Sequence, residues 1–173
     1  LQDELNVPVL IENADFYHGT LTDAAQSIEW SNELVQRTGA SLILDLAHLH
    51  IAAHNLGIPG AYFLGQVDLS RVQVLHVSGT TLAPDGVMHD GHSRAVTEDV
   101  WSLAELVLRT SHEPIDLVLE HTDPAWRSAP DLFSQDWERL RTIVSTHAGQ
   151  AAARAHYDYS KIGAGYFANI ILP

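Results

Sequence analysis

Four mostly apolar runs of this sequence each end on a side chain that can bind a metal or exchange a proton. Val7–Ile11 leads into Glu12, Leu42–Leu44 into Asp45, Val72–Leu75 into His76, and Ile115–Leu119 into Glu120. Such runs are typical of strands that are buried on both faces, as in parallel sheets. Because α/β enzymes keep their chemistry at the carboxyl ends of parallel strands, we expect the four side chains to meet at one edge of a sheet.

Two closely spaced pairs add further ligand-type side chains. His48 follows Asp45 by three residues, a spacing that places both on one face once the chain turns helical. His92 follows Asp90 by two residues, so an extended backbone would aim both to the same side. With the strand ends, the candidate metal ligands are Glu12, Asp45, His48, His76, Asp90, His92 and Glu120. This is more than one ion normally takes from protein, so we expect two or three ions, and the mixture of carboxylates and imidazoles suits iron, manganese or zinc better than calcium.

Each candidate also has an ordinary structural explanation. A carboxylate at a strand end, such as Glu12, can cap the next helix, and His76 can be a core histidine with satisfied hydrogen bonds. Asp90 can form an Asx-turn with Gly91. The coincidence of all four strand ends favours metal binding over these explanations. The remaining histidines divide into those in polar or helical contexts typical of the surface, His18, His112, His147 and His156, and those left open, His50, His54 and His121.

Composition limits the possible partners and cofactors. The 173 residues carry a formal net charge of −13 and nine Lys and Arg, which argues against a nucleic-acid partner because phosphate backbones require clustered basic residues. No cysteine is present, so a metal would be held by oxygen and nitrogen alone. No apolar run approaches the roughly 20 residues of a membrane span and no signal peptide is visible, so we expect a cytoplasmic protein that does not bind membranes.

The segments between the four runs predict helices and one long loop. Helices are expected at 22–38, 47–56, 61–67 and 134–148, with another that opens at Thr97. The segment 80–95 contains Pro84, Gly86 and Gly91 and lacks apolar periodicity. We therefore expect it to be a loop without regular structure, and loops of that length inside compact domains are usually functional.

The spacing of the four strand ends predicts the fold. They recur about every 30 to 45 residues, the rhythm of strand-plus-helix units in an α/β protein, which favours a (β/α)8 TIM barrel. A closed barrel typically needs about 250 residues and rarely fewer than about 200. We therefore expect an incomplete barrel, the larger C-terminal part of one. Residues 1–148 would form this metal-binding part, and residues 149–173 a tail that the pattern does not place.

Five short motifs resemble those of the multinuclear non-heme iron-dependent oxidases. In chain order they are Glu12-Asn13, Asp45-Leu-Ala-His48, His76-Val-Ser-Gly79, Asp90-Gly-His92 and Leu119-Glu120. Their order and spacing agree with the family pattern from about Val7 to Val144. The resemblance implies a TIM barrel that binds two or three irons at its C-terminal mouth, with the seven candidates above as ligands. It also implies that dioxygen is used to modify cysteine or other residues of a ribosomally made precursor peptide, with a small partner protein that grips the leader.

Other functions stay open at this level. A different divalent-metal barrel, such as a sugar isomerase or an endonuclease IV-like hydrolase, would also place carboxylates and imidazoles at strand ends. A non-catalytic metal-binding chain would keep the ligands without the reaction. A Ser-His-Asp hydrolase is disfavoured because no Gly-x-Ser-x-Gly elbow occurs. No individual catalytic residue can be named from the pattern.

Overall fold

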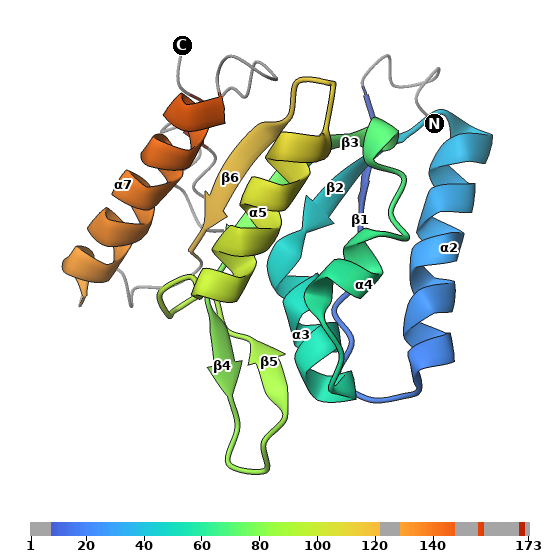
Figure 1. Ribbon diagram of the computed structural model, residues 1–173, viewed down its shortest axis with the longest axis horizontal. Coiled ribbons are helices and arrows are strands. Elements are labelled where there is room, and N and C mark those ends of the chain that lie inside the picture. Colours follow the sequence, from blue (N-terminus) through green and yellow to red (C-terminus); the bar gives the residue numbers. More distant parts are fainter. Residues whose placement is uncertain (1–7, 122–128, 148–155, 158–169, 172–173) are drawn as a thin grey trace.

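Four parallel strands form the central sheet of the computed structural model, which describes residues 8–121, 129–147, 156–157 and 170–171 (Figure 1). They are β1 (Leu10–Glu12), β2 (Ser41–Asp45), β3 (Val72–Ser78) and β6 (Asp116–Glu120), and their order in the sheet is their order in the chain. The register pairs Asp45 with His76 and Ser78 with Glu120. The four strands end at one edge of the sheet with a stagger, because Glu12 lies opposite Ile43 and Asp45 opposite His76, each two residues before the end of the neighbouring strand.

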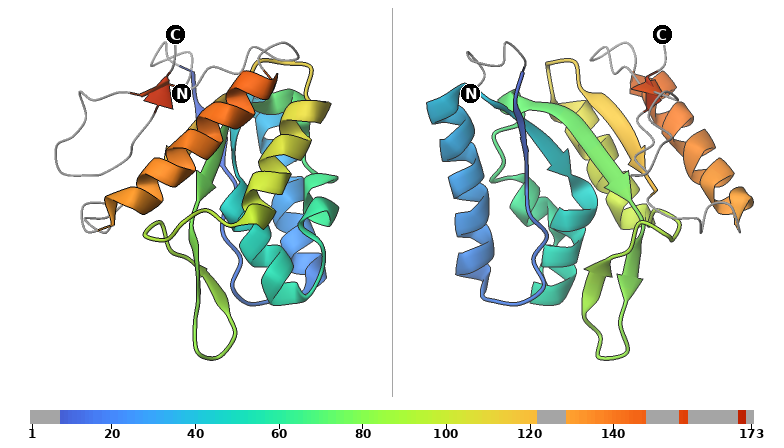
Figure 2. Two further views of the ribbon diagram at one scale, coloured as in Figure 1. Left: turned by 60° about the vertical axis from the view of Figure 1, so that its left-hand side comes forward. Right: turned by 180° about the vertical axis from the view of Figure 1, so that it is seen from behind.

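Helices connect the strands and lie against one face of the sheet. The long ones are α2 (Leu21–Thr38), α3 (Leu46–Leu56), α5 (Glu98–Thr110) and α7 (Pro130–His147), with the short α4 (Gly60–Leu64) and a 3-10 turn at Leu69–Arg71. Figures 1 and 2 show α2, α3 and α5 on the same side of the sheet. None of the helices in the described part of the chain combines the length and hydrophobicity that a membrane span requires.

Local sequence signals explain where the helices begin and end. Thr20 caps α2 and forms a capping box with Asp23, while Gly39 ends the helix in the left-handed conformation. Asp45 caps α3, and Gly57 ends it in the same way. α7 begins four residues before its predicted start, at Pro130, because proline is favoured in the first helical turn.

The prediction for residues 80–95 was wrong. The segment contains an antiparallel hairpin of β4 (Thr80–Leu82) and β5 (Met88–Asp90), which extends beyond the sheet edge in Figure 1. Each strand has only three residues, so no alternation of apolar and polar residues long enough to indicate a strand exists. Contacts from α3 hold the hairpin instead, through the Asn55 side chain on Met88 and the His54 ring on Gly86.

The arrangement is what part of a TIM barrel would have. Strands in sequential order with helices on one face have no point at which the strand order reverses, whereas doubly wound folds do. The structure thus confirms a mixed α/β chain with a parallel sheet, and the closed eight-stranded barrel stays a prediction. Of the predicted tail, only the antiparallel pair β7 (His156–Tyr157) and β8 (Ile170–Ile171) is described. Val7, with which the predicted first strand begins, lies outside the described residues.

The buried core between sheet and helices predicts unequal roles for two tryptophans. Trp101 on α5 is 2% exposed, and Trp30 on α2 is 61% exposed. Replacing Trp101 with Ala should lower the free energy of unfolding by about 3–5 kcal/mol, because it leaves a large cavity. Trp30→Ala is the matched control and should change it by less than about 0.5 kcal/mol. Denaturant titrations of both variants would check this, and equal losses would contradict the assignment of the core.

Candidate metal centre

The ends of the four parallel strands bring four ligand-type side chains together. One donor atom from each of Glu12, Asp45, His76 and Glu120 lies within 4.8 Å of the others. His76 is at the centre: its Nδ1 lies 3.0 Å from Glu12 Oε1 and 3.2 Å from Glu120 Oε2. Asp45 Oδ2 lies 4.0 Å from the same nitrogen. The expected convergence at one sheet edge is therefore present, and distances of this size leave room for an ion between the donors.

A second group contains the three remaining candidates. His48 from α3 and Asp90 and His92 from the hairpin also have donor atoms within 4.8 Å of one another. His48 Nε2 is 3.7 Å from Asp90 Oδ2, and His92 Nε2 is in direct contact with the same oxygen. Asp90 and His92 therefore lie together, as their spacing predicts. The backbone at His92 is not extended, however, because its φ is positive, at 39°.

Two carboxylates join the groups into one cluster. Asp45 Oδ2 lies 3.9 Å from His48 Nε2, and Glu120 Oε2 lies 3.7 Å from His92 Nδ1. Each of these carboxylates thus faces donors of both groups. Carboxylates that face two donor sets would suit a centre with more than one ion.

Several donor atoms in the cluster lack a hydrogen-bond partner. Asp45 Oδ2, His76 Nδ1 and His92 Nδ1 are buried and make no hydrogen bond of acceptable geometry. A buried polar atom without a partner costs roughly 1–3 kcal/mol, so native proteins rarely leave several of them side by side. Lone pairs that face a common space suit a cation, and this residue chemistry fits a transition metal held by oxygen and nitrogen.

Asp45 serves the helix and the candidate centre with different oxygens. Its Oδ1 accepts a hydrogen bond of 2.9 Å from the His48 backbone N–H and so caps α3. Its Oδ2 makes no hydrogen bond and lies near the His48 and His76 rings of the cluster. The capping explanation and the metal explanation therefore both apply to this residue, because a carboxylate has two oxygens.

Asn13 was not among the predicted site residues, yet it orients two of them. Its side-chain amide pairs with the backbone of Asp45, with Oδ1 accepting from the Asp45 N–H at 2.7 Å and Nδ2 donating to its carbonyl at 3.1 Å. Its own carbonyl accepts a hydrogen bond of 2.7 Å from His48 Nδ1. That bond leaves His48 Nε2 for the cluster, which is how outer partners usually fix a histidine ligand. The Glu-Asn pair was the available signal.

Gly79 explains how the hairpin approaches the strand ends. Its carbonyl accepts hydrogen bonds from the backbone N–H groups of Gly91 (3.2 Å) and His92 (3.0 Å). A Cβ at this position would lie 2.0 Å from the Arg94 carbonyl oxygen, a contact that no side chain tolerates. Only glycine therefore lets the segment 91–94 pack this closely. The neighbouring Ser78 hydroxyl, 3.5 Å from Asp90 Oδ1, helps to orient that carboxylate.

Clustering of the charges shifts several pKa values. Burial alone would lower the pKa of His76, but the Glu12 and Glu120 carboxylates beside its Nδ1 outweigh burial and raise this pKa to about 10. Burial would also lower the pKa of His48, but the neighbouring Asp90 and Asp45 carboxylates outweigh it and raise this pKa to about 9. Burial raises the pKa of Asp45 to about 6. The imidazoles thus retain protons that balance the carboxylates, and a bound cation would have to displace them.

Among the residues whose side chains the structure describes, no other histidine belongs to either group. His18 and His112 are exposed, as expected, but His147 is buried at the end of α7, so the prediction that it lies at the surface was wrong. Its Nδ1 has no hydrogen-bond partner among the described residues. His121 is also buried, with Nε2 3.5 Å from Asp136 Oδ2 on α7. The position of His147 depends on packing against its neighbours, which the helical pattern does not reveal.

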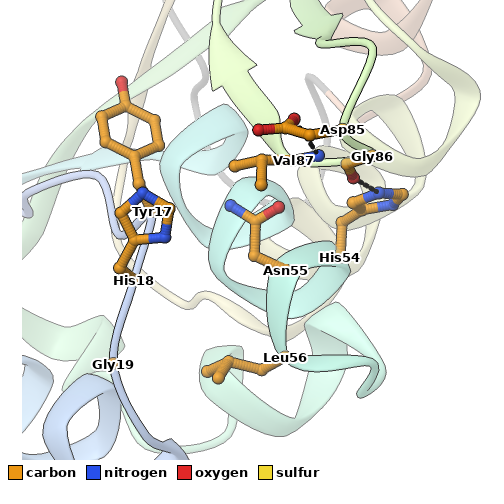
Figure 3. A pocket seen from close by; sticks show the side chains of 9 residues that line it. All are labelled: Tyr17, His18, Gly19, His54, Asn55, Leu56, Asp85, Gly86 and Val87. Atoms are coloured by element: carbon orange, nitrogen blue, oxygen red, sulfur yellow. Dashed lines mark hydrogen bonds between the residues drawn. The ribbon is translucent and has the colours of Figure 1, made fainter.

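A cavity of about 360 Å³ lies beside the hairpin (Figure 3). Its walls come from the loop 17–19, from the last turn of α3 and from the hairpin tip at 85–87. The Tyr17 ring at one wall packs against the His89 ring with 4.7 Å between centroids. His89 directly precedes Asp90. One wall of the cavity thus contacts the residue before Asp90.

Removing one hairpin donor tests the metal assignment. His92→Ala should lower metal bound per chain and weaken metal affinity by roughly tenfold or more, since even partners outside the coordination sphere contribute on that scale. The circular dichroism spectrum should be unchanged, because His92 lies outside the apolar core. His112→Ala, at an exposed position, is the control and should bind metal normally. Equal metal content in both variants would make Asp90 and His92 an ordinary polar turn.

Comparison with known proteins finds a matching family and several relatives. The sequence matches the family model described as RiPP precursor modification enzyme MbnB/TglH/ChrH over residues 1–144. It is 30% identical over 155 residues to a UPF0276 protein of Caulobacter vibrioides, an alignment that covers 88% of this chain and 53% of that protein. A UPF0276 protein of Paraburkholderia phytofirmans is 29% identical over 131 residues, covering 73% and 43% respectively.

The match to a Vibrio parahaemolyticus UPF0276 protein is 34% identical over 110 residues, covering 60% of this chain and 37% of that protein. The chain thus spans about half the length, or less, of the curated relatives that it matches. The family model covers all seven candidate ligands, which lie between Glu12 and Glu120. The chain therefore belongs to the MbnB/TglH/ChrH family of RiPP precursor modification enzymes.

Proposed function

We propose that this chain carries the metal centre of an iron- and dioxygen-dependent oxidase that modifies residues, cysteine above all, of a ribosomally made precursor peptide. Residues 1–148 would form part of a (β/α)8 barrel with the centre at its C-terminal mouth. The observation that carries the proposal is the continuous cluster of seven oxygen and nitrogen donors, in which Asp45 and Glu120 face both groups. Membership in a family of peptide-modifying enzymes supports the substrate class.

Two or three iron ions suit this donor set. Four carboxylates and three imidazoles favour iron, manganese or zinc. Glu12, Asp45, His76 and Glu120 would hold one ion. His48, Asp90 and His92 would hold a second, with Asp45 or Glu120 shared between them. When bound, iron would supply the electron-transfer chemistry with dioxygen that amino-acid side chains lack.

The residues around the donors have roles that follow from their contacts. Asn13 holds the Asp45 backbone and presents His48 Nε2 to the centre. Gly79 lets the segment with His92 close over the strand ends. Burial of Asp45 and Glu120, at 0% and 4% exposed, limits the access of water to the shared carboxylates. These features keep the donor positions defined before substrate arrives.

A peptide fits this surface better than a nucleic acid does. The net charge of −13 opposes a phosphate backbone. The cavity beside the hairpin has polar walls from Tyr17, Asn55 and Asp85, and Tyr17 packs against His89, the residue before Asp90. We propose that it holds the residue next to the one being modified. A small partner protein that grips the leader of the peptide would complete the assembly.

Metal identity and oxygen use test the proposal together. The full-length protein, purified without oxygen and loaded with Fe²⁺, should consume dioxygen and change the mass of a cysteine-containing precursor peptide. The measurements are metal analysis, an oxygen electrode and mass spectrometry of the peptide. Bound Mn²⁺ or Zn²⁺ without oxygen consumption would contradict the proposal and favour a sugar isomerase or an endonuclease IV-like hydrolase. Metal binding without any turnover would favour a non-catalytic metal-binding chain.

Filling the cavity tests the place of the peptide. Val87 lines it from the hairpin tip (Figure 3). Val87→Trp should raise KM for the peptide by roughly tenfold, because one displaced side chain in a pocket has effects on that scale. Metal content should not change. Leu82→Trp is the matched control, since Leu82 lies on the other hairpin strand, is 59% exposed and does not line the cavity. Equal peptide kinetics in both variants would place the peptide elsewhere.

A further inference from the structure

Asn55, in the last turn of α3, connects three segments through its side-chain amide. Its Oδ1 accepts a hydrogen bond of 2.8 Å from the Met88 backbone N–H. Its Nδ2 donates to the Met88 carbonyl at 3.0 Å and to the Phe16 carbonyl at 3.3 Å. In Figure 3 the side chain lies between the loop of residues 17–19 and the hairpin. A single amide therefore pairs with Met88 as a neighbouring strand would and also holds the loop that follows β1.

The position of this bridge gives it influence over the candidate centre. Met88 begins β5, Asp90 ends it, and His92 follows two residues later. Within the described part of the chain, β5 pairs with β4 alone. Asn55 binds Met88 from the side of α3, the helix that also carries His48. It thus links the elements that supply all three donors of the second group.

We infer that Asn55 is a positioning residue for the candidate metal centre: its amide sets the distance of Asp90 and His92 from His48 and from the strand ends. This inference rests on the proposed metal-binding function. Asn55 does not belong to either donor group, so it acts through the hairpin and not on the metal itself. Residues that orient metal ligands without binding the metal typically change metal affinity by roughly 10- to 100-fold.

The chain offers a matched control in Asn32 on α2. Its Nδ2 donates to the Gln66 carbonyl at 2.7 Å, and its Oδ1 accepts from the Asp68 N–H at 3.0 Å. Asn32 thus makes the same kind of two-sided bridge to a loop that carries none of the seven candidate ligands. Loss of either bridge should cost comparable stability, whereas only the loss of the Asn55 bridge should disturb the metal donors.

The experiment is a Co²⁺ titration of the full chain followed by visible absorption, with thermal unfolding of each variant alongside. Unaltered protein must first show Co²⁺ binding; if it binds none, the proposed metal function fails, whatever Asn55 does. Asn55→Ala should weaken Co²⁺ binding by about 10- to 100-fold. Asn32→Ala should keep the Co²⁺ affinity within about threefold of that of the unaltered protein. Both variants should unfold at temperatures lowered by a similar amount. Equal affinities in the two variants would overturn the role of Asn55.

Two further variants separate positioning from a general loss of structure. Asn55→Asp keeps the shape and the acceptor for Met88 N–H but loses both donated hydrogen bonds, so it should also weaken Co²⁺ binding. Normal binding would overturn the inference even if Asn55→Ala fails to fold.

A double variant combines Asn55→Ala with His92→Ala. The Asn55 substitution should add little to the loss of Co²⁺ affinity that His92→Ala alone causes, because both act on one group of donors. Fully additive losses would show that Asn55 acts elsewhere.

Discussion

Electrostatic compensation among four carboxylates and three imidazoles is the constraint on which this structure depends. Glu12, Asp45, Asp90 and Glu120 lie so close together that they would repel one another without positive charge between them. The imidazoles provide that charge by retaining protons, as the raised pKa values of His48 and His76 indicate. A metal ion provides it more fully, because it also gives the unpartnered lone pairs a common acceptor. The cluster is therefore a candidate site for cations.

Backbone contacts keep this cluster in place. Asn13 pairs with the backbone of Asp45, the Gly79 carbonyl binds two N–H groups of the hairpin, and Asn55 binds both backbone groups of Met88. Each contact joins a segment that carries donors to the sheet or to α3. These backbone contacts leave Asp45 Oδ2, His76 Nδ1 and His92 Nδ1 without hydrogen bonds.

The sheet and most helices were predictable because their signals are local. Apolar runs such as Leu42–Leu44 indicate buried strands, and residues such as Thr20 and Gly39 begin and end helices through contacts within a few positions. The hairpin at 80–90 was missed because its strands are too short for periodicity and are held by α3 instead. The burial of His147 was missed for a related reason, since tertiary packing determines it.

What the sequence by itself determined was the set of candidate ligands and their place at strand ends, because the carboxyl ends of parallel strands must share one edge. Membership in the family followed from the same residues, in the same order. Only the tertiary structure decided that the seven donors form two groups joined by Asp45 and Glu120, and that Asn13 and Asn55 support them. The contacts of Asn13 and Asn55 join residues more than thirty positions apart, and no local pattern in the chain encodes a distance across the fold.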